Sequence, residues 1–390
     1  MKILVLCCLP EEYNNSSMLC VSLLCKGFIE NGHSVALASP EPDENNRYYN
    51  PNYNFDSRIT HIRFGKRSFK RDISKRSVSR RSALFPLLAI YRKIDLFGRS
   101  ITTLKYVDEL IEKLRSIEYK PDMIISTSDP KSSHLLGNKI KGKKIYSCPF
   151  VQYWGDPLTL DIANQSVLPK WIKKIVENSI LKRADVIAYV SPLTLSEQKE
   201  FFKKHAKKMI FSPTPCEIKI YEGNNRTFSI GYFGSYNSSV RNIIPLYESV
   251  SGIPRINLYI IGDSDVKLES KNNIVVINRV PAEKLKKYYD VCDVIVDIMN
   301  FKGSQIPAKI YRDAGTNKEI LLISDSKKSN EIIDYFGRFN RYTICNNNKS
   351  DISFFLEEYL ENGTPLREPL REFEYVTVSR KLLKDILTIM

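Results

Sequence analysis

Residues 274–298 read IVVINRVPAEKLKKYYDVCDVIVDI. The apolar runs at 274–280 and 294–299 each have the length of a strand that is buried on both faces. The intervening residues 281–292 have the pattern of a helix. A strand, a helix and a second strand in so short a segment indicate two parallel strands joined by a helical crossover.

The same alternation extends over the whole chain in two sets, and it favours an α/β fold with helices on both faces of parallel sheets. In open sheets of this kind, ligands bind beyond the carboxyl ends of the strands. Two facing sheets would therefore form a cleft. The expected strands are 2–9, 34–40, 59–65, 123–128, 145–154 and 186–191 in the first set, and 228–235, 257–262, 274–280, 294–299, 319–324 and 341–345 in the second.

The two sets predict two domains separated by a polar, irregular segment with two prolines. We assign residues 1–207 to the first domain, 208–227 to a linker and 228–372 to the second domain. Residues 373–390 form a last helix with no strand after it, which we expect to pack back on the first domain.

Length and composition agree with this division. At roughly 150 residues per domain, 390 residues make two to three domains. The 43% hydrophobic and 26% charged residues exclude wholesale disorder. No run approaches the roughly 18 to 20 apolar residues of a membrane span. The apolar start at 2–9 stops at Pro10, Glu11 and Glu12, so it does not fit a signal peptide, and we expect a cytoplasmic protein.

The net charge of +15 predicts an anionic partner, which could be nucleic acid, an anionic membrane surface or a phosphorylated ligand. The eight cysteines contain no C-x-x-C pair and the four histidines no H-x-x-x-H pair. We therefore expect neither a disulfide framework nor a zinc site, and no metal or cofactor.

Three familiar motifs are absent or misplaced. There is no G-x-G-x-x-G, which weakens a nicotinamide dehydrogenase hypothesis. Residues 137–144, GNKIKGKK, are close to a phosphate-binding loop, but they lie between a helix and the next strand rather than between a strand and a helix. The D-x-D of residues 263–265 follows a strand, and we interpret it as a turn.

Two loops show features of an anion site. After the strand at 228–235, Gly234 and Ser235 precede a loop that ends at Arg241, where glycine permits close backbone approach and a helix follows. Further on, Pro307 opens a helix with Lys309 in its first turn, an electrostatically unfavourable place for a cation unless it serves an anion. The alternatives are a solvated arginine in a surface loop and a lysine that extends to water.

Taken together and in order, several segments resemble the GT-B glycosyltransferases, specifically the family-4-like enzymes that build bacterial capsule, O-antigen and exopolysaccharide chains. The resemblance covers nearly the whole chain. It implies two Rossmann-like domains facing across a cleft, with a nucleotide sugar bound mainly by the second. The segments are 28–39, 121–128, 151–157, 181–191, 230–235, 257–263, 279–296 and 306–324.

The resemblance also implies roles for individual residues. Backbone groups at the end of the first strand of the second domain would contact the diphosphate, two cations would neutralise it, and other residues would lie beside the base or open the helix under the phosphates. The donor-binding residues would be Gly234, Ser235, Arg241, Arg279, Val280, Pro307, Ala308, Lys309 and Arg312. The acceptor-facing residues would be Asn15, Ser16, Trp154, Gly155 and Asp156.

The chain departs from the family pattern at two places. The family usually has two glutamates about eight positions apart, of which the second commonly binds the ribose; here these positions are Ser304 and Arg312, with Asp313 adjacent. Many relatives also have a histidine near the end of the fourth strand, where this chain has residues 126–128 and His134 only later. These departures leave ribose recognition and activity open.

The implied mechanism is transfer with retention at the anomeric carbon, in which the leaving diphosphate takes up the proton of the acceptor. Positioning and charge stabilisation are then the tasks of the protein. Arg241 and Lys309 would stabilise the diphosphate in place of a metal ion. Asp156 would orient the acceptor or act as a base, or else it is a structural residue before Pro157.

A basic segment, residues 63–99, has a further implication. Its first part, 63–81, has nine Lys or Arg residues and one acid, Asp72, and an apolar stretch follows at 83–97. It is either a solvated loop before a core helix or a segment that docks on anionic lipid. Nucleic acid is the less favoured partner, because the segment lacks a recognisable nucleic-acid-binding motif.

Our hypothesis is a glycosyltransferase, peripheral at the inner face of the cell membrane. It would transfer a sugar from a nucleotide diphosphate sugar to a lipid-linked or oligosaccharide acceptor in cell-surface polysaccharide synthesis. The alternatives are a nucleotide-sugar epimerase of the same fold and a non-catalytic GT-B-like scaffold subunit.

Overall fold

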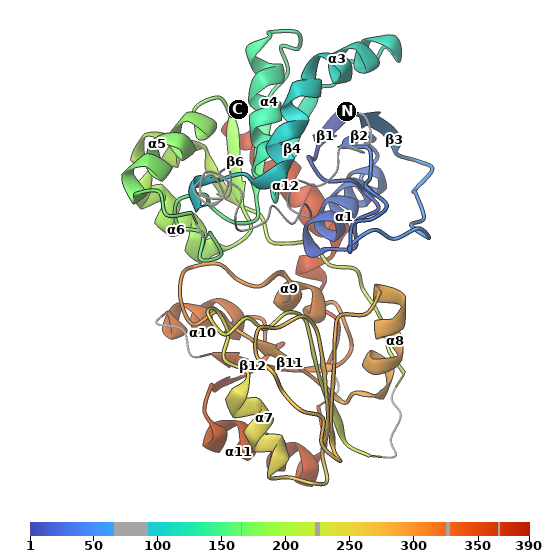
Figure 1. The fold of residues 1–390 in the computed structure, drawn as a ribbon, viewed down its shortest axis with the longest axis vertical. Coiled ribbons are helices and arrows are strands. Elements are labelled where there is room, and N and C mark those ends of the chain that lie inside the picture. Colours follow the sequence, from blue (N-terminus) through green and yellow to red (C-terminus); the bar gives the residue numbers. More distant parts are fainter. Residues whose placement is uncertain (66–92, 165, 223–226, 325–327, 366) are drawn as a thin grey trace, which may run out of the picture. The chain divides into compact units, whose positions relative to one another are not determined.

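A computed structural model describes the chain except for residues 66–92, 165, 223–226, 325–327 and 366 (Figure 1). The described residues divide into two compact units. Unit 1 is Met1–Ser212 together with Ser379–Met390, and unit 2 is Pro213–Val378. Each unit has one sheet of parallel strands alternating with helices, which confirms the predicted α/β class.

The sheet of unit 1 has the order β3-β2-β1-β4-β5-β6-β7, with all neighbours parallel. Its central strands are buried on both faces, as their continuous apolar runs predicted. The strands are β1 (Lys2–Leu6), β2 (Ser34–Pro40), β3 (Thr60–Phe64), β4 (Met123–Thr127), β5 (Phe150–Trp154), β6 (Val186–Tyr189) and β7 (Met209–Phe211).

Helices cover both faces of this sheet (Figure 1). One apolar cluster joins alternate strand residues to α3, α4 and α5. Leu24 of α1 and Asn31, which caps the end of α1, accept hydrogen bonds from Ser379 and Arg380 of the last helix, α12 (Tyr375–Ile389). The other helices are α1 (Ser16–Glu30), α3 (Val107–Ser116), α4 (Ser132–Gly142), α5 (Lys170–Leu181) and α6 (Pro192–Phe201), with 3₁₀ helices η1 (Gly98–Tyr106) and η2 (Lys203–Lys208).

The structure corrects the start of the predicted linker. Residues 209–211, assigned from sequence to the linker, form strand β7 and pair with β6. Three residues behind a run of lysines are too short a pattern to indicate a strand, and pairing with β6 supplies the missing hydrogen bonds. The segment 137–144 lies in the last turns of α4 and the residues just after it, so it is not a strand–loop–helix phosphate loop.

The sheet of unit 2 has the order β10-β9-β8-β11-β12-β13, again with parallel neighbours. The chain runs outward from β8 to β10 and then returns to the other side of β8 with β11. The strands are β8 (Ser229–Phe233), β9 (Asn257–Ile261), β10 (Ile274–Ile277), β11 (Val294–Ile298), β12 (Glu319–Ser324) and β13 (Thr343–Asn346).

One apolar cluster joins this sheet to α7 and α11, which lie side by side in Figure 1, and a second cluster under α8 covers the other face. No helix among the described residues is long and apolar enough to span a membrane. The helices are α7 (Ile244–Ser251), α8 (Ala282–Val291), α9 (Ala308–Ala314), α10 (Ser329–Gly337) and α11 (Lys349–Asn362), with the 3₁₀ helix η3 (Arg371–Phe373).

Candidate active site

The carboxyl edge of β8 and β11 is the place in unit 2 where ligand binding is expected. These two strands are neighbours, but the chain continues from β8 toward one side edge of the sheet and from β11 toward the other, so this is the switch point of the topology, where folds of this kind bind ligands. One backbone hydrogen bond joins the two loops, from the Phe301 N–H to the Val240 carbonyl at 3.0 Å. The predicted donor-binding residues come from these loops and from the helix that follows.

Two glycines let the loops after β8 and β9 approach each other. A Cβ atom on Gly262 would lie 2.0 Å from the Gly234 carbonyl oxygen, so a side chain there has no room. Gly234 itself has φ +155°, in the region that favours glycine. A Cβ atom on Gly234 would lie 3.3 Å from Cδ of Lys309, so the lysine stem passes close to the bare backbone.

Lys309 is a buried cation at this edge, with a side chain only 7% exposed. Its Nζ lies 3.2 Å from Oδ1 of the fully buried Asp297 and 3.4 Å from the centre of the Tyr232 ring. The ion pair lacks hydrogen-bond geometry, and Nζ has no hydrogen-bond partner within the described part of the chain. The charge of this buried ammonium is paired, but its donors make no well-aligned hydrogen bond to the described residues, so a further anionic acceptor would be favourable here.

Burial raises the pKa of Asp297 to about 6, although the ammonium of Lys309 opposes this shift. The carboxyl group therefore responds to charge placed beside Lys309. An anion bound at the ammonium would weaken the stabilisation that Lys309 gives to the ionised carboxyl group, and the pKa of Asp297 would rise further.

Two arginines converge on Ser235. Arg241 donates from Nη1 to the Ser235 carbonyl at 2.8 Å, and its buried Nε has no partner among the residues described. Arg279 donates from Nη2 to the Ser235 hydroxyl at 3.0 Å and pairs through Nε with Asp263 at 3.1 Å. Together with Lys309, they place three cationic side chains around the backbone of Gly234 and Ser235.

The other predicted donor-binding residues differ in how close they lie to these cations and in how exposed they are. Pro307 is the N-cap of α9, and Ala308 begins the helix, as expected. Val280 is partly buried against the apolar cluster under α8. Arg312 points instead to Asp313, with Nε 3.3 Å from Oδ1, and one-third of its side chain is exposed.

The structure also shows what occupies the positions of the two family glutamates. Ser304 is buried, so it presents little surface to a ligand. Asp313, next to Arg312, does not supply a substitute carboxylate at the surface. It is buried and accepts a hydrogen bond from the Tyr289 hydroxyl at 2.7 Å.

In unit 1, the predicted acceptor residues lie at the carboxyl ends of β1 and β5. Asn15 is the N-cap of α1 and accepts a hydrogen bond from the Met18 N–H at 2.9 Å, while Ser16 is exposed. Gly155 donates from its backbone N–H to the Ser128 hydroxyl at 3.1 Å, which ties the loop after β5 to the loop after β4.

The structure corrects the prediction for Trp154. Its side chain is fully buried, its Nε1 donates to Gln152, and its ring lies 4.1 Å from that of His134 on α4. Successive side chains of a strand alternate between the faces of the sheet, so Trp154 shares the helix-covered face with Phe150. A fully buried ring does not contact an acceptor; it supports the strand end that carries Gly155 and Asp156.

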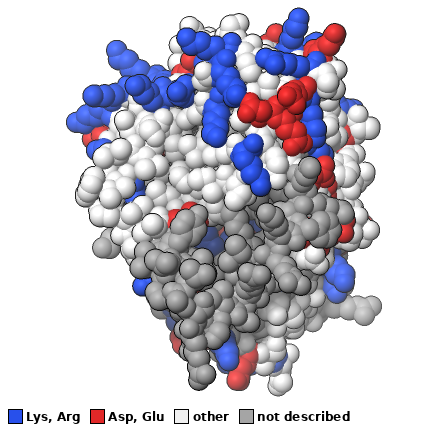
Figure 2. All heavy atoms as spheres, turned by 45° about the horizontal axis from the view of Figure 1, so that its top comes forward, with Lys and Arg blue, Asp and Glu red and all other residues white. Residues whose placement is uncertain are grey.

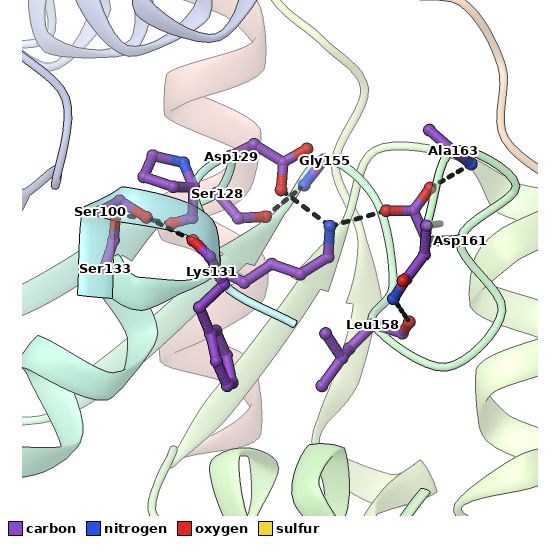
Figure 3. A network of polar contacts seen from close by, with 12 residues as sticks. Ser100, Ser128, Asp129, Lys131, Ser133, Gly155, Leu158, Asp161 and Ala163 are labelled. Carbon is purple, nitrogen blue, oxygen red and sulfur yellow. Dashed lines mark hydrogen bonds and ion pairs between the residues drawn. The ribbon is translucent and has the colours of Figure 1, made fainter. Parts of the chain in front are cut away.

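Figure 3 shows the network that orders this edge of unit 1. The buried Lys131 pairs through Nζ with Asp129 and with Asp161, both at 2.9 Å. Burial alone would lower the pKa of Lys131, but the carboxylates of Asp129, Asp161 and Asp156 raise it above its ordinary value. The lysine therefore stays charged and joins the loops after β4 and β5, which fixes the surroundings of Asp156.

A second carboxylate, on α5, stabilises the loop after β5. Glu177 of α5 is fully buried and accepts the backbone N–H groups of Leu158 at 3.1 Å and Thr159 at 2.7 Å. Burial raises its pKa, while these hydrogen bonds oppose the shift. Glu177 and Lys131 thus position the residues that follow β5.

No family model and no curated protein sequence matches the chain. Solved structures do match over its full length. Sucrose-phosphate synthase from Thermosynechococcus elongatus has a TM-score of 0.66 at 11% identity, covering 100% of this chain and 98% of that one. HepE of Anabaena, in complex with UDP and glucose, has a TM-score of 0.59 at 12% identity, with 100% of both chains covered. A trehalose-6-phosphate synthase from Burkholderia multivorans has a TM-score of 0.57 at 11% identity, covering 100% of this chain and 98% of that one.

The fold is GT-B. At these identities the likeness shows the fold alone, but it agrees with two parallel sheets of matching topology and with the resemblance that the sequence indicated. In this GT-B chain, the structure brings Gly234, Ser235, Arg241, Arg279 and Lys309 together at one edge of unit 2.

The sequence analysis did not identify some residues at the carboxyl edges of the two sheets. Asp297 is the one charged residue in the apolar strand β11, a sequence signal that could have drawn attention to it. Lys131 follows a buried strand within a few residues, a weaker signal of the same kind. Glu177 gave no signal, since an acid in a helix is ordinarily exposed to water.

Proposed function

We propose that this chain is a glycosyltransferase that uses a nucleoside diphosphate sugar as its donor. The observation that carries the proposal is the buried Lys309 ammonium with unused donors beside the bare backbone of Gly234. Arg241 and Arg279 add two guanidinium groups around Ser235. This arrangement suits a diphosphate, since cations in a low-dielectric site interact with it more strongly than in water.

The same groups would assist the chemical step. Cleavage of the bond from sugar to phosphate leaves negative charge on the diphosphate, and fixed cations stabilise that charge without reorganising. We propose that Arg241 and Lys309 perform this task without a metal ion. In unit 1, Asn15, Ser16, Gly155 and Asp156 would bind the acceptor, with Asp156 orienting its hydroxyl group. The same proposal includes three further points. The transfer would retain the configuration of the sugar, the acceptor would be lipid-linked, and the product would belong to surface polysaccharide synthesis at the inner membrane face.

Nucleotide binding is the direct test. Calorimetric titration of UDP, GDP and CDP, with Mg²⁺ and with EDTA, should give metal-independent binding of one nucleotide. Incubation with the matching nucleotide sugars and membrane extracts should then release that nucleoside diphosphate. Failure of all three to bind would overturn the proposed donor site.

One observation favours a second candidate, a non-catalytic nucleotide-binding subunit. Ser304 and Arg312 have no carboxylate, and the neighbouring Asp313 is buried and paired with Arg312, so these positions do not present the carboxylate that the family uses for ribose. Nucleotide binding without any turnover or sugar transfer would support this candidate over the transferase.

A further inference from the structure

One face of α5 exposes large apolar side chains. Trp171 and Ile175 lie one helical turn apart and are 64% and 61% exposed, and Val167 before the helix is 64% exposed. The opposite face of the helix buries Glu177, Ile180 and other residues against unit 1. Exposed apolar residues that lie singly need no explanation, but a stripe that includes a tryptophan is a candidate for a docking surface.

The stripe continues toward the basic segment. The Val167 N–H donates to the Lys93 carbonyl at 2.8 Å, which places the residues just after 66–92 beside the start of α5. Ile94 there is also exposed. Residues 66–92, which include most of the predicted lipid-docking segment, lie outside the described residues, and the surface defined here does not include them.

Basic side chains flank the stripe. Lys170 and Lys174 lie on the same helix and are exposed, and Lys182 and Arg183 follow its end. Glu177 is the only acid of α5, and it is fully buried. The positive charge therefore faces solvent, while the negative charge is used inside the protein.

The neighbouring 3₁₀ helix η2 extends this charge. His205 and Asn178 of α5 form a hydrogen bond at 3.0 Å, and Lys208 donates to the Leu181 carbonyl at 2.8 Å. These contacts bring the exposed Lys203, Lys204 and Lys207 next to α5. Nearby acids are Glu197 and Glu200 of α6, which line a hollow with Lys170, and Asp185 after α5, which pairs with Lys141 at 2.9 Å.

Figure 2 shows Lys and Arg side chains gathered on the part of its face that belongs to unit 1. We propose that the face formed by Val167, Trp171 and Ile175 with their flanking lysines, which we call the α5 face, docks on an anionic lipid bilayer. The indole would lie at the level of the headgroups, where tryptophan is favoured, and the lysines would meet lipid phosphates. The inference rests on the proposed function in one respect: docking would bring the protein to a lipid-linked acceptor.

A bilayer suits this face better than other anionic partners. Three or four exposed apolar side chains make a much smaller patch than the roughly 800 Å² that each partner buries in a stable protein complex. Nucleic acid would use the lysines but not the aliphatic side chains. A bilayer needs no complementary shape, and it accepts apolar and basic groups at the same time.

Tryptophan fluorescence offers a specific test, because the chain has two tryptophans and Trp154 is fully buried. With phosphatidylglycerol–phosphatidylcholine vesicles, Trp171 emission should shift to the blue, and lipids brominated near the headgroup should quench it. Pure phosphatidylcholine vesicles should give neither effect. Vesicle binding that leaves Trp171 accessible to a water-soluble quencher would assign lipid contact to another surface and overturn the proposal.

Variants separate the apolar and the charged contributions. Trp171→Gln with Ile175→Gln, and Lys170→Gln with Lys174→Gln, should each weaken sedimentation with the anionic vesicles by about tenfold or more. The matched controls are Phe354→Gln, with the same 64% exposure on α11, and Lys267→Gln with Lys349→Gln, both of which should bind vesicles normally. Equal loss in variants and controls would contradict the proposal.

Nucleotide binding distinguishes the two proposals. The α5 variants should bind UDP, GDP or CDP as the original chain does, which also shows that they fold. A chain that docks through Trp171 but binds no nucleotide would retain the inference and overturn the proposed function. A chain that binds nucleotide but shows no lipid contact of Trp171 would do the reverse.

Discussion

Replacing Lys309 by methionine removes the ammonium group on which the proposed donor site depends. Methionine keeps an unbranched side chain of similar length, so the contact of the stem with the Gly234 loop should persist, whereas the contact of Nζ with the Tyr232 ring is lost together with the charge. The change therefore tests the charge rather than the packing.

The magnitude follows from two opposing effects. A hydrogen bond from an ammonium to a phosphate contributes about 1.5–3 kcal/mol, which is about 10- to 150-fold in Kd. The pKa of Asp297 is raised to about 6 even beside Lys309. Without the ammonium, this carboxyl should be protonated at neutral pH, so the variant loses one positive and one negative charge together. The expected loss of affinity therefore lies at the low end of the range, at roughly tenfold.

The assay is calorimetric titration of the preferred nucleoside diphosphate, with thermal unfolding as a check on the fold. Lys271→Met is the matched control, because Lys271 is exposed at the amino end of β10, away from the site edge. Adding Asp297→Asn to the methionine variant should change Kd little, since the carboxyl is already neutral. An unchanged Kd in Lys309→Met would refute the placement of Lys309 in the site.

Three further outcomes are expected. Because burial raises the pKa of Asp297 above its usual 3.8 to about 6, its ionisation opposes folding. The stability that the protonated form provides, full below pH 4, should be lost as pH rises through about 6, and Asp297→Asn should flatten that part of the urea-unfolding profile. Gly262→Ala places a Cβ atom 2.0 Å from a backbone oxygen and should cost about 1–3 kcal/mol in thermal unfolding and weaken nucleotide binding. Gly337→Ala, whose Cβ would have no described heavy atom within 4 Å apart from its chain neighbours and its own helix backbone, should do neither. Glu177→Gln should cost about 1–3 kcal/mol, because one of two buried backbone N–H groups loses its acceptor; equal melting temperatures of variant and parent would contradict the role of Glu177.

The sequence was sufficient for the strands and for the class of fold. Each strand of a doubly covered parallel sheet is buried on both faces, so its residues form a continuous apolar run that is visible without the structure. The twelve expected strands are all present, and within the described part of the chain only β7 was missed. The same order of segments also indicated the GT-B fold, and the cations Arg241 and Lys309 were found because they follow such runs.

The tertiary structure decided which side chains meet. Asp297 and Lys309 lie on β11 and α9, which one loop joins, and the packing of α9 against β11 brings the ammonium to the carboxylate; the Tyr232 ring is added because β8 lies next to β11 in the sheet. Trp154 looked like a surface residue because it ends a strand, yet α4 covers the face to which it points. The apolar and polar pattern of a segment indicates which of its residues are buried. The pairing of charges depends instead on distances between different segments, and those distances are set only when the sheets have formed.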